Sequence, residues 1–283
     1  MKDSVLQKGL NAYQIKIIAL IAMTIDHLAA YGSDIPLFSA YGSKLRIVGR
    51  IAAPLFLYMV TEAVRHTSNR KQYLLRLYIG AVCTGLFSAI TNILFANSIG
   101  TFRHSNILFT FLYTALLIIL IEKTVIGINE KKQKQAALCA VGIIAVFTVH
   151  YVYLLIEKSL PAGTFTHDLL NSFLISPLRV EYSILFIFMG IVMYFAPNKY
   201  WKSAAVIGVS LLCCDARIVY ALRFIPSVVT MGPPQHWMIL AVPFILLYNG
   251  DRGKSQKLFF YAYYPIHRYL ICVVVYFYLL FCS

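Results

Sequence analysis

The chain has 283 residues, of which 60% are hydrophobic and 13% are charged, and its formal net charge is +14. About a quarter of the residues of an ordinary soluble domain are charged, so the composition excludes that class and indicates a multi-pass membrane protein. The basic residues cluster between apolar runs, as topology-setting charges do, which argues against a nucleic-acid partner. The six cysteines show no spacing typical of metal ligands, so we expect no metal.

Nine apolar segments are candidates for membrane-spanning helices, which need about 17 to 25 residues, although the eighth is shorter than that. They are residues 13–31, 46–64, 73–96, 105–122, 136–157, 180–196, 203–222, 236–248 and 258–281. We therefore predict an all-α polytopic integral membrane helix bundle with roughly nine transmembrane helices, in a range of about 8 to 11. No repeat of fixed period is present, so residues 1–283 are expected to form a single integral-membrane domain.

The connectors between these segments predict the orientation of the chain. If the N-terminus is cytoplasmic, the basic connectors all lie on the cytoplasmic side, namely 65–71, 123–134, 199–202 and 252–257. Counted with the N-terminal lysines, Lys16 and Arg76, 16 of the 25 basic residues then lie inside. Cytoplasmic loops carry the excess of Lys and Arg, so we predict a cytoplasmic N-terminus.

The first apolar segment contains Asp26 and His27 in its middle. Ionisable groups at that depth cost several kcal/mol unless they face a protein interior, so this pair is a candidate functional site. Lys16 precedes His27 by eleven residues. Eleven helical steps place the two on one face within about 20°, and roughly 16 Å apart along the axis.

Polar groups on four segments fall at one depth. His27, Arg50, Asp215 and His267 each lie ten to fifteen residues from a basic residue at the predicted cytoplasmic surface. At about 1.5 Å per residue, all four then lie within roughly 15 to 22 Å of that surface. The hydrocarbon core offers no tolerable place for them except a shared interior cavity. Arg46, four residues before Arg50, would join Arg50 in holding an anion or in pairing with a carboxylate.

Four stretches of the chain carry a family resemblance. They are IKIIALIAMTIDH, LRIVGRIAAPLFLYMVTEAVRHTSNRKQYLLRL, SNILFTFLYTALL and LYNGDRGKSQKLFFYAYYPIHRYLI. In this order they resemble the TraX family, which is named for a conjugative pilin acetylase, and the resemblance spans most of the chain. Lys16 and His27 also match the Arg/Lys-x10-His pattern of a wider group of transmembrane acyltransferases that includes the acyltransferase-3 enzymes.

The resemblance implies a multi-pass protein of the bacterial cytoplasmic membrane that transfers an acetyl or related acyl group from cytoplasmic acetyl-CoA. The acceptor would be a peptide amine or a glycan hydroxyl reached within or across the membrane. His27 matches the histidine regarded as catalytic in the wider group, and Lys16 matches the basic residue of its motif. Glu181 and Tyr182 resemble an acidic-Tyr-Gly stretch of TraX proteins, but Ser183 replaces the glycine, so Glu181 is assigned no catalytic role.

These observations suggest a mechanism in which His27 acts as general base or carries the acyl group itself. The further catalytic candidates, which would stabilise the oxyanion, orient His27 or relay its proton, are Asp26, Arg50, Asp215 and His267. Phosphates favour clustered cations. The candidates for binding the acyl-CoA are therefore Lys16, Arg46, Arg65, Arg70, Lys71 and Arg76.

Three alternatives stay open, and one of them is a structural or assembly protein of the envelope. A proton-coupled transporter or exporter would also place Asp, His and Arg in the membrane, although no inverted repeat or matching pair of broken helices is present. A purely structural reading is the third alternative: an intramembrane histidine is often only hydrogen-bonded to a neighbouring helix, and a pair such as Asp26 and Arg50 can serve the fold alone.

Overall fold

The computed structural model describes residues 9–33, 35–99, 106–161, 164–224 and 233–282. Within these ranges no β-strand forms, and one isolated backbone bridge pairs Leu10 with Tyr248. The prediction of an all-α bundle is thus confirmed. Lys2 and Lys8, which were counted for the orientation of the chain, lie outside the described residues.

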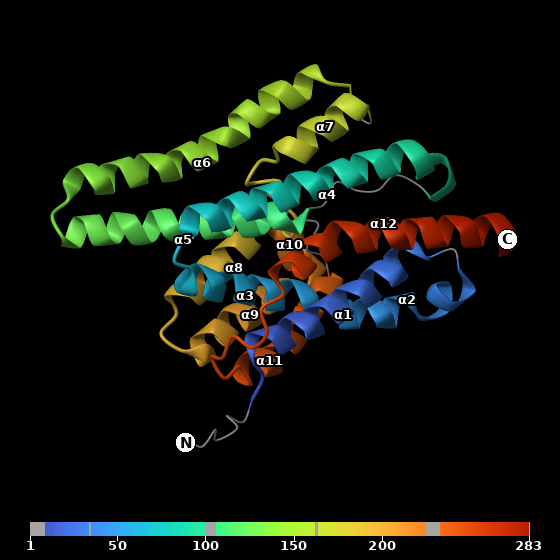
Figure 1. Ribbon diagram of the computed structural model, residues 1–283, viewed down its shortest axis with the longest axis horizontal. Coiled ribbons are helices and arrows are strands. Elements are labelled where there is room, and N and C mark those ends of the chain that lie inside the picture. Colours follow the sequence, from blue (N-terminus) through green and yellow to red (C-terminus); the bar gives the residue numbers. More distant parts are fainter. Residues whose placement is uncertain (1–8, 34, 100–105, 162–163, 225–232, 283) are drawn as a thin grey trace.

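The long helices run roughly along the longest axis of the molecule (Figure 1). In chain order the helices are α1 (Ala12–Tyr31), α2 (Pro36–Gly49), α3 (Ala52–His66), α4 (Arg70–Ile99), α5 (Ile107–Asn129), α6 (Gln133–Ser159), α7 (Phe165–Phe173), α8 (Ser183–Phe195), α9 (Lys199–Leu212), α10 (Ala216–Ala221), the 3-10 helix η2 (Pro233–Ala241), α11 (Val242–Leu246) and α12 (Lys257–Cys282). The pair α6 and α7 forms one outer edge, and α1, α3 and α12 lie nearer the middle (Figure 1).

Six helical stretches of the described chain are long and apolar enough to cross a membrane. They are Ala12–Tyr31, Pro36–His66, Arg70–Leu94, Ile107–Asn129, Gln133–Ser159 and Phe259–Phe281. Two shorter apolar helices, Ser183–Phe195 and Pro234–Leu246, accompany them. A multi-pass membrane bundle is therefore confirmed, whereas the expected number of nine spans is not.

The predicted span at 203–222 is interrupted. α9 ends at Leu212, and Asp215 begins the short helix α10 as its N-cap by accepting a hydrogen bond from the backbone N–H of Arg217 at 2.7 Å. Aspartate is among the residues preferred at this position because its carboxylate satisfies a free N–H of the first turn. The apolar run therefore divides into two helices, and no single helix passes through Asp215.

Burial differs strongly among the spanning helices. In Pro36–His66, 67% of the most apolar window is buried inside the protein, against 17% in Gln133–Ser159. A spanning helix that is mostly uncovered by protein turns its apolar side chains to lipid. α3, in which eleven residues are buried, thus belongs to the interior of the bundle, and α6 belongs to its lipid-facing edge.

The start of α1 is tied to the connector that leads into α12. Backbone hydrogen bonds join Leu10 N–H to the Leu247 carbonyl at 2.8 Å and Ala12 N–H to the Asp251 carbonyl at 2.8 Å. Asn11 caps α1 in a reciprocal arrangement with Gln14. These contacts hold the connector beside the first turn of the first helix.

Candidate active site

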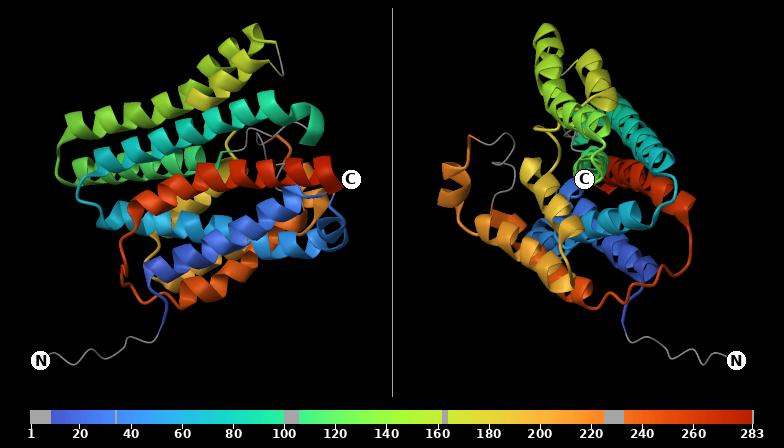
Figure 2. Two further views of the ribbon diagram at one scale, coloured as in Figure 1. Left: turned by 45° about the vertical axis from the view of Figure 1, so that its right-hand side comes forward. Right: turned by 90° about the vertical axis from the view of Figure 1, so that its left-hand side faces the viewer.

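The site centres on two histidines that come from opposite ends of the chain. His27 lies on α1 and His267 on α12, and these helices pack against each other (Figure 2). His27 Nδ1 is 2.7 Å from His267 Nε2, and the rings stack with their centroids 4.9 Å apart. The second nitrogen of His267, Nδ1, lies 2.8 Å from the carbonyl oxygen of Tyr263. Two residues expected at one depth are therefore in direct contact.

The hydrogen bonds define where the protons lie when both imidazoles are neutral. A carbonyl oxygen only accepts, so His267 Nδ1 donates to Tyr263, and His267 Nε2 is left as an acceptor. His27 Nδ1 must then donate to His267 Nε2, which places the lone pair of His27 on its Nε2 atom. His27 consequently has one ring nitrogen that can accept a proton or attack a carbon.

Asp26 belongs to a separate polar group beside the histidines. Its carboxylate accepts a hydrogen bond from Arg50 Nη2 at 3.0 Å and lies 4.0 Å from Arg46 Nε. Arg50 also donates from Nη1 to Gln235 Oε1 at 3.0 Å. Its buried Nε has no hydrogen-bond partner among the described residues. Asp26 thus pairs across the bundle, as expected for a residue that points away from His27.

A glycine allows this pairing. Gly49 is buried at the end of α2 and faces α1, where an added Cβ would collide with the side chain of Asp26. Pro54, four residues after Arg50, lacks the N–H that would continue the helix. The break between α2 and α3 falls at residues 50 and 51, so the guanidinium of Arg50 enters the interior from a helix end.

Glu181 lies close to the same charges, although no catalytic role was expected for it. Arg268, Asp26 and Arg50 are among the groups that act electrostatically on its carboxylate. The next two residues, Tyr182 and Ser183, adopt φ values of 63° and 62°. This left-handed conformation costs an L-residue about 1–2 kcal/mol and favours glycine. The glycine that the TraX pattern has at position 183 therefore indicates a left-handed backbone there, and Ser183 adopts that conformation in a strained turn beside the site.

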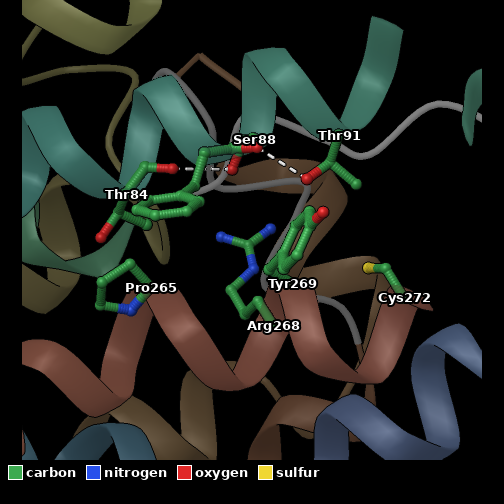
Figure 3. Close-up of a pocket in the computed structure, with 8 residues that line it drawn as sticks. Thr84, Ser88, Thr91, Pro265, Arg268, Tyr269 and Cys272 are labelled. Atoms are coloured by element: carbon green, nitrogen blue, oxygen red, sulfur yellow. Dashed lines mark hydrogen bonds between the residues drawn. The ribbon is translucent and has the colours of Figure 1, made fainter. Parts of the chain in front are cut away.

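Arg268 is a buried cation that sequence reasoning missed. It is 7% exposed, and its Nε donates to the hydroxyl of Tyr31 at 3.1 Å. Figure 3 shows its guanidinium pointing from α12 toward α4, where three hydroxyl-bearing residues line a small pocket, namely Thr84, Ser88 and Thr91. Each of these hydroxyls donates to a backbone carbonyl four residues earlier in α4. The only available sequence signal was the position of Arg268 directly after His267 in an apolar helix.

A cavity of about 490 Å³ leads toward the histidines from one end of the bundle. Its volume lies in the range of about 300–1,000 Å³ usual for ligand sites. Met23 and Tyr263 line its inner end, and each precedes one of the site histidines by four residues, which is one helical turn. The ring of Tyr263 also stacks on that of His267 with their centroids 5.0 Å apart. The cavity therefore ends next to the histidine pair.

Cations surround the mouth of this cavity. Lys16 and Arg76, both expected to bind the acyl-CoA, line it, and so do Arg252 and Lys254 from the connector before α12. Lys16 Nζ lies 5.7 Å from the centroid of the Phe260 ring. Lys16 is thus at the mouth and His27 beyond the inner end, as their spacing on α1 predicted.

Three other residues expected to bind the acyl-CoA do not line the cavity. Arg65 donates to the carbonyl of Tyr194 and stacks over the ring of the same residue. Arg70 forms an ion pair with Glu122, and Lys71 is exposed to solvent. Partners on other helices engage Arg65 and Arg70, so the structure does not bring these three residues to the cavity, and their binding of acyl-CoA stays a prediction. Arg46 is likewise placed beside Asp26 rather than at the mouth.

Asp215 is the expected catalytic residue that the structure places elsewhere. Its carboxylate accepts hydrogen bonds from its neighbour Arg217, with a shortest distance of 2.7 Å to Nη2, and the Arg217 side chain is 92% exposed. Its helix, α10, lies on the side of the bundle away from α12 (Figure 2, right). The depth estimate failed because it assumed one unbroken helix from Lys202 to Asp215.

The chain was also compared with known proteins. The family model described as TraX protein matches residues 11–167 and 169–275. The chain belongs to the TraX family. A relative described as probable fimbrial assembly protein FimC, serogroup H1, from Dichelobacter nodosus is 27% identical over 277 residues, which cover 93% of this chain and 94% of the relative. No solved structure matches.

Proposed function

We propose that this protein is a membrane acyltransferase of the bacterial cytoplasmic membrane, related in mechanism to the acyltransferase-3 group. It moves an acetyl or related acyl group from cytoplasmic acyl-CoA to an amine or hydroxyl of an envelope acceptor. The observation that carries this proposal is the hydrogen-bonded chain from His27 through His267 to Tyr263, because Tyr263 lines the inner end of a cavity with a cationic mouth.

In the direct mechanism, the acceptor nitrogen or oxygen attacks the thioester carbonyl carbon. His27 Nε2 takes the proton that the acceptor loses, so the new C–N or C–O bond forms without a charged acceptor. The C–S bond then breaks, and the imidazolium returns the proton to the leaving CoA thiolate. His267 accepts the hydrogen bond from His27 Nδ1 throughout and so keeps Nε2 directed at the substrate.

The two-step variant uses the same atom as a nucleophile. His27 Nε2 attacks the thioester carbonyl carbon, the C–S bond breaks, and CoA leaves as its thiolate. The acyl group stays on the imidazole as an acylimidazolium until the acceptor nitrogen or oxygen displaces it, and the proton that the acceptor loses goes to water. This variant suits an acceptor on the far side of the membrane, because the donor and the acceptor need not be present together.

Arg50 is the proposed support for the developing oxyanion. Two of its nitrogens are engaged by Asp26 and Gln235, while its buried Nε has no partner among the described residues. A buried donor that is preorganised for negative charge stabilises an oxyanion strongly because little water competes with it. Asp26 and Gln235 hold this guanidinium in place.

For the acceptor, the name of the relative points to a surface appendage. A fimbrial assembly protein acts where fimbrial subunits are available, so we propose a peptide amine of such a subunit, with a glycan hydroxyl as the second candidate. Mass spectrometry of envelope peptides and glycans, from cells with and without the intact gene, distinguishes the two by the molecule that loses its acyl group.

Purified protein and radiolabelled acetyl-CoA test the chemistry without a known acceptor. The wild type should release labelled acetate slowly, carry label itself, or gain thermal stability from acetyl-CoA. His27→Ala should lower the turnover by about 10²–10⁴-fold and retain the thermal shift. Rapid separation of the protein at neutral pH, with His27→Ala as the comparison, shows whether label resides on His27, because an acylimidazole hydrolyses quickly in acid. Absence of turnover, labelling and protection in the wild type would exclude the enzyme and favour a transporter.

A further inference from the structure

The connector between α11 and α12 forms part of the cavity mouth. Its residues 250, 252, 254, 255 and 256 line the cavity, and the side chains of Arg252 and Lys254 are exposed there. Sequence reasoning assigned this connector only to the orientation of the chain. In the structure it brings two cations and the hydroxyl of Ser255 to the place where a ligand would enter.

The connector has a defined backbone conformation. Gly250 and Gly253 have φ values of +88° and +65°, which glycine adopts without strain. At Gly253 an added Cβ would lie 2.6 Å from Asn11 Oδ1, so this part of the connector packs against the N-cap of α1. Asp251 N–H also bonds to Asn249 Oδ1 at 2.9 Å. Arg252 and Lys254 are thus carried on a turn with fixed neighbours.

The charge at the mouth is positive and unbalanced. In the described part of the chain, no salt bridge involves Arg76, Arg252 or Lys254. The carboxylate that lines the mouth, Glu62, accepts a hydrogen bond from buried Lys202 at 2.5 Å. Like charges brought together in a cleft attract an anion of several charges.

A second basic connector at the same end offers a contrast. Among residues 65–71, Arg65 is engaged by Tyr194 and Arg70 by Glu122, and Lys71 does not line the cavity. The two connectors look equivalent in sequence because each carries several cations next to an apolar helix. Only the connector before α12 presents its cations to the cavity.

We propose that Arg252 and Lys254, together with Lys16 and Arg76, form the binding site for the phosphates of the acyl-CoA nucleotide. This inference rests on the proposed function and deepens it, because it assigns donor recognition to residues 249–256. Charge-assisted hydrogen bonds from Lys and Arg are the usual means of holding phosphate oxygens. From Lys16, the eleven residues to His27 span about 16 Å along α1, a distance that the pantetheine arm would cover inside the cavity.

The test compares ligands with and without phosphates on a charge-matched pair of variants. Arg252→Gln/Lys254→Gln removes two cations from the mouth. Lys71→Gln/Lys134→Gln removes two exposed cations that do not line the cavity. Calorimetry in detergent then gives the Kd of coenzyme A, of adenosine 3′,5′-bisphosphate and of pantetheine for each protein.

We expect the mouth variant to bind coenzyme A and the bisphosphate about three- to tenfold more weakly, the range for exposed charge pairs of about 0.7–1.4 kcal/mol in total. Pantetheine should bind equally to all three proteins, and the matched control should equal the wild type. The weakening should shrink as salt rises. An unchanged Kd for both phosphate ligands, or an equal loss in the control, would overturn the proposal.

Failure of the proposed function gives a different result. If the wild type binds coenzyme A and the mouth variant binds it more weakly, but the wild type never turns over acetyl-CoA, the phosphate site is supported and the proposed acyl transfer is wrong. If the wild type turns over acetyl-CoA and the mouth variant has the same Michaelis constant for it, the acyl transfer is supported and the proposed phosphate site is wrong.

Discussion

Beyond the inner end of the cavity, charged side chains are buried and paired with one another, whereas at its mouth the side chains of Arg252 and Lys254 are exposed. Asp26 and Arg50 have side chains only 14% and 10% exposed and lie 3.0 Å apart. Arg252 and Lys254 are exposed, and within the described chain neither forms a salt bridge, although Arg252 donates a hydrogen bond to the hydroxyl of Ser255 at 3.5 Å. A buried charge without a partner is destabilising, so the inner groups must be fixed, while the outer ones are left to bind. The inner end should therefore set the rate and the stability, and the mouth the affinity.

The largest effect is expected from breaking the inner pair. Asp26→Asn leaves the buried Arg50 without its carboxylate, which should lower the free energy of unfolding by about 3–5 kcal/mol. Chemical unfolding in detergent, followed by tryptophan fluorescence, measures it. Asp215→Asn is the matched control: its carboxylate pairs with the exposed Arg217, so the same change there should leave both stability and turnover close to the wild type. Equal losses of stability at the two positions would contradict the view that burial makes the Asp26–Arg50 pair more important than the exposed Asp215–Arg217 pair.

The next largest effect concerns the orientation of His27. His267→Phe keeps a flat ring but removes the acceptor for His27 Nδ1, and the loss of a hydrogen bond worth about 1.4 kcal/mol should lower kcat about tenfold. His267→Gln can place its amide oxygen near the position of Nε2 and should recover part of the rate.

Two further readouts separate orientation from simple damage. The pH profile of kcat should shift in His267→Phe and return toward the wild type in His267→Gln, while the KM for acetyl-CoA should stay constant in both. A loss of rate with an unaltered pH profile in both variants would assign His267 to the fold alone.

A smaller change is expected at the mouth end of α1. Lys16→Gln should raise the KM for acetyl-CoA about three- to fivefold without changing kcat, because an exposed pair contributes at most about 1 kcal/mol. Lys16→Arg keeps the charge and should behave as the wild type. Steady-state kinetics over a range of acetyl-CoA concentrations measures both constants. A fall in kcat would show that Lys16 acts in the acyl-transfer step rather than in binding acetyl-CoA.

The smallest effect is expected for Lys71→Gln. Lys71 is exposed and does not line the cavity, so its replacement should leave the KM, kcat and thermal stability within error of the wild type. A raised KM here would contradict the contrast between the two basic connectors.

Helix geometry alone was enough to predict the core of the site. The eleven-residue spacing of Lys16 and His27 fixed their relative direction, and the depth of His267 placed it near His27. These inferences hold because α1 and α12 are continuous helices through the residues concerned. The helical class followed equally from the long apolar segments.

What could not be predicted depends on contacts between distant segments. The pairing of Arg70 with Glu122 joins residues 52 apart in the chain, and no local pattern distinguishes a cation held in that way from one that is available for a ligand. The depth predicted for Asp215 was wrong because the helix breaks within a continuous apolar run. The preference of aspartate for the N-cap position could have indicated this break. Glu181 was given no catalytic role because Ser183 replaces the glycine of the TraX pattern. The backbone at Ser183 nevertheless adopts the left-handed conformation that a glycine favours.

The contact between His27 and His267 closes a loop of 240 residues. A protein is synthesised from its N-terminus, so α1 enters the membrane long before α12 exists. Throughout that interval His27 lacks the neighbour that sets its tautomer, and Leu10 and Ala12 lack the carbonyls of residues 247 and 251 that anchor the start of α1. The ring of His27 thus gains its hydrogen-bond partner only at the last stage of biogenesis, and under the proposed mechanism a chain truncated before its final helix would be inactive.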